Sequence, residues 1–138
     1  MLCTFNNVTV KTGRAATVLA DAGSGAVIKF YTGAQPSDAS VAVTGTLLAT
    51  LACSYPFGVV TSGVSGDQSA YLTAGPITSG MGLFTATPGF ARLWTSGSVG
   101  VVDLDCSATG GSGAVIMTPD TITLNAPVSI SSLVITEG

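Results

Sequence analysis

The sequence predicts an all-β fold, a jelly-roll-like β-sandwich that leaves room for one short N-terminal helix. Three observations support this fold class. About eight to ten short runs rich in β-branched and aromatic residues follow one another along the chain. Gly, Pro and Ser separate these runs, as is typical of strands joined by turns. Only 8% of the residues are charged while 46% are hydrophobic, which favours a folded core over disorder.

The N-terminal part, residues 1–24, is expected to form an arm, a helix or both. Residues 14–23 (RAATVLADAG) give the one plausible helix, because alanine is frequent there, Thr12 is placed to cap it and Gly23 to end it. A chain of 138 residues is one domain by default, so we expect residues 1–138 to form a single β-sandwich domain.

The rest of the chain reads as a series of short strands. A hairpin turn is predicted at Gly97-Ser98, between two apolar runs. A slip in the apolar alternation at Ser131-Ser132 predicts a bulge in the last strand. In chain order the expected strands are 26–32, 46–55, 58–60, 68–74, 82–87, 90–96, 99–106, 114–118, 121–125 and 127–136.

The hexapeptide GSGAVI occurs twice, at 23–28 and at 111–116. A phosphate-binding loop would need a third glycine or a Gly-Lys-Ser/Thr sequence opening a helix, and both copies instead lead into β-branched residues. Glycine supplies turn conformations and Ala-Val-Ile begins a strand, so the repeat indicates one loop-to-strand device used twice.

Charge and cysteine content exclude several classes of protein. The net charge is −3, and the four cations are scattered, so neither direct nucleic-acid binding nor a cofactor site is expected. The apolar stretch 41–60 contains Gly and Pro and favours strands over a membrane span, and the N-terminus lacks the features of a signal peptide. The widely spaced Cys3, Cys53 and Cys106 are expected to be free thiols, made in a reducing cytosol.

Catalytic residues are scarce, and we expect no enzyme. The chain has no histidine, which removes the commonest general base and metal ligand. Asp103 and Asp105 share one face of a strand and, with Asp120, would suit Ca²⁺ or a glycoside-hydrolysing carboxylate pair. The plainer expectation is that Val102 and Leu104 face the core while both aspartates face water, with no metal bound.

Arg92 and Trp94 share a strand face with Phe90. In one interpretation, the two aromatic rings are core and the Arg92 side chain extends along the surface to water. In the other, Arg92 and Trp94 form an exposed aromatic–arginine patch of the kind found at protein–protein contacts.

Four segments of the sequence resemble a known family. These are VIKFYTGAQPSDA and TLLATLACSYPFG, then FARLWTSGSVGVVDLDC, then TITLNAPVSISSLVITEG at the C-terminus. They resemble small virion proteins of tailed phages and prophages, most closely the capsid cement (decoration) proteins of the Bordetella phage type. The likeness covers about 25–138, although Ser-Gly-Ser stands here where that family has an Asp-Gly turn.

The resemblance implies a jelly-roll protein on the outside of the virion capsid, made in the host cytoplasm. Its partners would be the major capsid protein and neighbouring copies of itself, and it would have no catalytic residues. Tyr31, Gln35 and Pro36 are the candidates for a capsid-facing loop, alongside Arg92 and Trp94 as partner contacts. The alternative is a tail or fibre module that recognises a host surface glycan through an exposed aromatic and the aspartate face.

Overall fold

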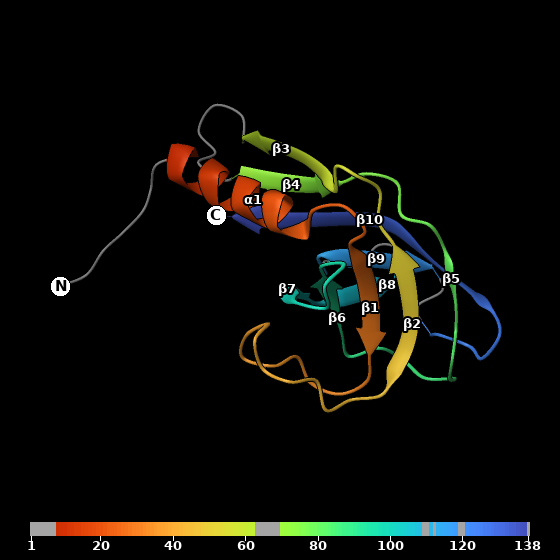
Figure 1. The fold of residues 1–138 in the computed structure, drawn as a ribbon. Coiled ribbons are helices and arrows are strands. Elements are labelled where there is room, and N and C mark those ends of the chain that lie inside the picture. The colour runs from red at the N-terminus through yellow and green to blue at the C-terminus, as the bar shows by residue number, and fades with distance from the viewer. Residues whose placement is uncertain (1–7, 63–69, 109–110, 112, 119–120, 138) are drawn as a thin grey trace.

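The computed structural model describes residues 8–62, 70–108, 111, 113–118 and 121–137. These residues form a mostly β structure in which two sheets pack together beside one N-terminal helix (Figure 1). The elements are α1 (Val8–Ala22), β1 (Val27–Tyr31), β2 (Leu47–Ala52), β3 (Gly58–Ser62), β4 (Ala70–Ala74), β5 (Gly80–Met81), β6 (Phe90–Trp94), β7 (Gly100–Leu104), β8 (Cys106–Ala108), β9 (Val115–Thr118) and β10 (Pro127–Glu137).

The four-stranded sheet has the order β2-β1-β6-β7, and all of its neighbouring strands are antiparallel. The six-stranded sheet follows the order β3-β4-β10-β9-β8, and β5 pairs with β10 beside this path. Its pairs are antiparallel except β8 and β9, which run parallel. Strands that follow each other in sequence thus pair within one sheet, and this order does not show jelly-roll topology.

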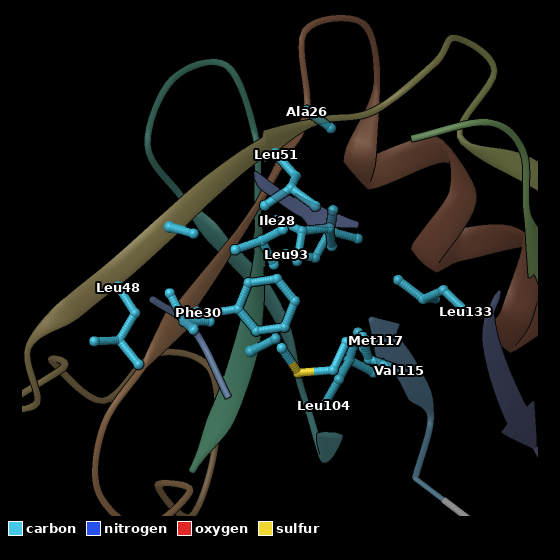
Figure 2. Close-up of a cluster of buried hydrophobic side chains, with 14 of the residues drawn as sticks. Ala26, Ile28, Phe30, Leu48, Leu51, Leu93, Leu104, Val115, Met117 and Leu133 are labelled. Atoms are coloured by element: carbon cyan, nitrogen blue, oxygen red, sulfur yellow. The ribbon is translucent and has the colours of Figure 1, made fainter. Parts of the chain in front are cut away.

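The core lies between the two sheets, and the alternation of side chains along each strand builds it (Figure 2). In β1, Ile28 and Phe30 are fully buried and point toward the second sheet, while the residues between them face the other way. Met117 of β9 and Leu133 of β10 meet them from the six-stranded sheet. Closing these apolar faces against each other is the main source of stability of such a sandwich.

Helix α1 packs on the six-stranded sheet over β3, β4 and β10. It begins at Val8, well before the expected start, so Thr12 lies inside the helix and its assignment as a cap was wrong. Ala15 is completely buried, which lets the helix approach the sheet closely. The end is as predicted, because Gly23 follows in the left-handed conformation with φ of 61°.

Three local predictions are confirmed. Both copies of GSGAVI lead into a strand at their valine, β1 at Val27 and β9 at Val115. The hairpin joins β6 to β7, with Ser98 at φ 62° in its turn. The register of β10 against β9 shifts between Ile130 and Ser132, where the bulge was expected.

Two predicted strands, 82–87 and 121–125, are wrong as continuous strands. They form only isolated bridges, Gly82 with Leu124 and Ala86 with Ile122, while the short strand β5 comes just before them. The glycines in this region allow close backbone approach but lack the side chains that a regular strand would pack. In the described part of the chain, no helix has the length and hydropathy needed to cross a membrane.

Candidate functional site

The predicted contact residues come together on one side of the four-stranded sheet. Because side chains alternate along β1 and β6, the residues between the core positions point away from the second sheet. We call this side the outer face, and its residues are Lys29, Tyr31, Phe90, Arg92, Trp94 and Asp103.

A loop of residues 33–45, here called the strap, connects β1 to β2 and crosses the outer face (Figure 1, where it follows β1 in orange). The strap carries the other two predicted residues, Gln35 and Pro36. The Gln35 side-chain amide donates to the Asp103 carbonyl oxygen at 3.4 Å. The strap lies so close to β7 that a Cβ on Gly100 would stand 2.5 Å from the Ala39 carbonyl oxygen. This contact requires glycine at position 100.

Arg92 fixes the strap from below. Its guanidinium group donates through Nη1 to the Val41 carbonyl oxygen at 2.7 Å and through Nη2 to the Asp38 carbonyl oxygen at 3.4 Å. These bonds join the middle strand of the sheet to a loop more than 50 positions earlier in the sequence. At the base of the strap, the Thr32 amide donates to the Thr46 carbonyl oxygen at 3.1 Å. The strap is therefore closed at its ends and held at its centre.

The same guanidinium group forms a bidentate ion pair with Asp103. The two residues lie directly opposite each other on β6 and β7, and Nε and Nη2 donate to the two carboxylate oxygens. Their side chains are only 1% and 3% exposed. Both interpretations of Arg92 were therefore wrong, since it neither reaches solvent nor lies on an exposed patch. The expectation that Asp103 faces water was also wrong, because the strap covers it.

Two pairs of contacts surround this ion pair. Trp94 is half-buried, and its ring lies 5.5 Å from Lys29 Nζ and 5.4 Å from Arg92 Cζ. Tyr31 stacks on Phe90 with centroids 5.4 Å apart. Burial raises the pKa of Tyr31, and the nearby Trp94 indole partly opposes that rise. The indole nitrogen is buried close to Tyr31 but makes no well-formed hydrogen bond in the described structure.

The outer face is thus a structural lock, and it lacks the arrangement of a catalytic site. Asp103 is held by Arg92, while Asp105 is exposed and accepts from the Ala114 amide at 2.8 Å. Asp120, the third member of the suggested Ca²⁺ set, lies outside the described residues. Among the described residues, no three His, Cys, Asp or Glu side chains gather as a metal would require.

The two described thiols are poor nucleophiles at neutral pH. Burial raises the pKa of Cys53 to about 11. Burial and, to a lesser degree, the charge of Asp105 raise the pKa of Cys106 to about 12. Both are free, as the sequence predicted, and Cys3 lies outside the described residues. A thiol that stays protonated does not attack substrates or bind metals.

A shallow hollow of about 500 Å³ lies beside β9 and β10. Its lining includes Asp105, Ser132 and Thr136. The Asp105 carboxylate is already engaged with the backbone of Ala114, so the hollow offers little charge to a ligand. It carries no functional assignment.

Sequence reasoning missed a group of exposed apolar side chains beside β5. We call this group the apolar patch, and it consists of Met81 (53% exposed), Leu83 (46%), Phe84 (56%) and Leu124 (53%). The signal was present in the stretch GMGLF, where large apolar residues alternate with glycine instead of with polar residues. That alternation was taken as part of a strand from 82 to 87, which assumed a buried face.

Comparisons of the chain with protein-family models, with curated proteins and with solved structures found no match. A functional assignment therefore depends on the geometry described above and on the resemblance within the sequence. Both concern surfaces that contact other proteins.

Proposed function

We propose that this protein is a non-enzymatic structural protein of a virion, a capsid cement (decoration) protein that binds the outside of the major capsid protein shell and stabilises it. One observation carries the proposal: large apolar side chains are exposed on a chain that has few charges. Eight of them are between 41% and 71% exposed, namely Val41, Tyr55, Val59, Met81, Leu83, Phe84, Val99 and Leu124.

Such an exterior suits a protein that is covered by its neighbours. Soluble proteins normally protect sheet edges and apolar groups with charged residues, especially lysine. Here only 8% of the residues are charged. Each contact of this kind is weak, but repetition over an icosahedral shell multiplies weak contacts into stable binding.

The strap is the surface that we assign to the shell. It carries Gln35, Pro36 and the exposed Val41, and its shape is held from below by Arg92. A loop fixed in this way loses little conformational entropy on binding, which favours affinity. The partners would be the major capsid protein and neighbouring copies, and the location would be the capsid exterior. A jelly-roll order of strands remains part of the family resemblance, and the proposal does not require it.

The glycan-binding alternative has less support. It was motivated by an exposed aromatic ring near two aspartates, and Asp103 is instead buried in its pair with Arg92. Trp94 is half-buried between the cations of Lys29 and Arg92, so little of its ring faces solvent for a sugar.

The direct test is binding to expanded empty shells. We expect the purified protein to co-sediment with shells at micromolar concentration and to raise their melting temperature. Val41→Lys places a charge on the strap and should weaken binding at least tenfold, whereas Val59→Lys, an equally exposed valine of β3, should not. Absence of binding at micromolar concentration, or immunogold label on tail tips with bare heads, would refute the proposal.

A further inference from the structure

The segment beside β5 closes the open side between the two sheets. Leu83 donates from its amide to the Leu48 carbonyl oxygen of β2 at 2.8 Å. Gly82 exchanges hydrogen bonds with the chain before β10, donating to the Ala126 carbonyl oxygen and accepting from the Asn125 amide, both at 2.9 Å. In Figure 1 this segment lies at the edge of the molecule, between β2 and β10. Its backbone is thus satisfied on both sides.

Two glycines let this segment lie against both sheets. A Cβ on Gly80 would stand 2.4 Å from the Thr50 carbonyl oxygen, and a Cβ on Gly82 would stand 2.1 Å from the Thr123 carbonyl oxygen. Because side chains alternate along an extended chain, Met81 and Leu83 must then point outward. The segment would pack equally well with polar residues at these two positions, so folding does not explain why they are apolar.

The apolar patch is continuous across two segments. Gly82 bridges to Leu124, and the Leu124 amide donates to Thr85 Oγ1 at 3.1 Å, which places Leu124 beside the outward side chains. Four large side chains that are each about half exposed form a group of a few hundred Å², a size that marks interaction sites on soluble proteins. Aromatic residues and methionine are also enriched at the centres of protein interfaces.

The surroundings of the patch contain no charge. Residues 70–91 and 121–136 include no Asp, Glu, Lys or Arg, and the side chains next to the patch are the neutral Thr85, Thr123 and Asn125. A partner with a charged docking surface would lose hydration here without gaining a counter-charge. A second copy of the chain presents the same neutral, apolar surface, and a two-fold axis makes any such surface self-complementary.

We propose that the apolar patch docks a second copy of this chain, patch to patch. The proposal deepens the proposed function, which requires contacts between neighbouring copies, and it assigns them to a surface separate from the strap. A typical stable interface buries about 800 Å² per partner, more than the patch alone supplies. We therefore expect a weak, reversible dimer in solution, strengthened where copies are held close together on a particle.

Sedimentation velocity of the full chain from about 1 to 300 μM tests the dimer. The sedimentation coefficient should rise with concentration toward that of a dimer. The double variant Met81→Ser with Phe84→Ser should raise the dissociation constant at least tenfold. Val99→Ser, a 62%-exposed valine in the β6–β7 hairpin, is the matched control and should leave it unchanged.

Circular dichroism should show that the variants melt within a few degrees of the parent protein. If the first pair unfolds, Leu83→Ser with Leu124→Ser takes its place in the same measurement. A protein that stays monomeric throughout, or patch variants that dimerise like the parent, would overturn the proposal. So would patch variants that lose shell binding while the parent is monomeric, because the patch would then contact the shell.

The two proposals fail separately. Dimer formation is measured on the free protein, without shells. Shell binding is measured at a concentration where the protein is monomeric and is probed through Val41 on the strap. Loss of one result therefore leaves the other standing.

Discussion

Replacing Arg92 with methionine should destabilise the protein strongly. The change leaves the Asp103 side chain, 3% exposed, as a buried charge without its partner. It also removes the donors to the Val41 and Asp38 carbonyl oxygens of the strap. Removing one member of a buried ion pair typically costs about 3–5 kcal/mol, and a domain of this size has about 5–15 kcal/mol in total. We therefore expect Arg92→Met to lose a large part of the free energy of unfolding.

The double variant Arg92→Met with Asp103→Leu separates the ion pair from the packing. Replacing both charges by apolar groups of similar size is often neutral, so the double variant should recover most of the loss. Arg92→Lys keeps the charge but not the planar fork, and it should fall between the parent and Arg92→Met. The conservative control is Arg14→Met on the exposed side of α1, which should change stability by less than about 0.5 kcal/mol.

Urea unfolding followed by the fluorescence of Trp94, the single tryptophan, measures all four variants. Hydrogen exchange should show faster exchange of the strap amides in Arg92→Met than in the parent. A loss below about 1 kcal/mol for Arg92→Met would refute the reasoning. So would a double variant that is no more stable than Arg92→Met, because the two residues would then act independently.

Three further outcomes follow from the structure. Gly82→Ala should destabilise by at least about 2 kcal/mol because its Cβ would meet the Thr123 carbonyl oxygen, whereas Gly13→Ala, with open space in α1, should stabilise by about 0.5–1 kcal/mol; thermal melts compare them. With the N-terminal cysteine replaced by serine, Cys53 and Cys106 should react with a thiol reagent at pH 8 far more slowly when folded than in urea, and equal rates would contradict their burial. Since the folded thiol pKa values lie above the unfolded value of about 8.5, that stabilisation is complete below about pH 8.5 and is lost as the pH rises to about 11, measurable as a falling urea midpoint.

The parts of the fold that depend on local pattern could be predicted from the sequence. The alternation in VIKFY placed Ile28 and Phe30 in the core, and glycine followed by Ala-Val-Ile marked the start of a strand twice. The slip at Ser131-Ser132 gave the bulge of β10. Each of these features is fixed by a few neighbouring residues.

The features that depend on distant partners could not be predicted. Arg92 and Asp103 looked exposed because the residues beside them are apolar, and the register of β6 against β7 was needed to see them as a pair. The cover over them comes from the strap, whose path no local pattern specifies. The apolar patch was missed for the same reason, since Gly80 and Gly82 face backbone atoms of two different sheets.

Burying Arg92 with Asp103 also determines how the fold responds to salt. Ions in solution screen exposed charges over a Debye length of about 8 Å at physiological strength, but they reach a sealed pair poorly. The strap excludes them from this one, and few other charges remain on the molecule for them to act on. The folded chain should therefore hold its shape almost unchanged from dilute buffer to molar sodium chloride.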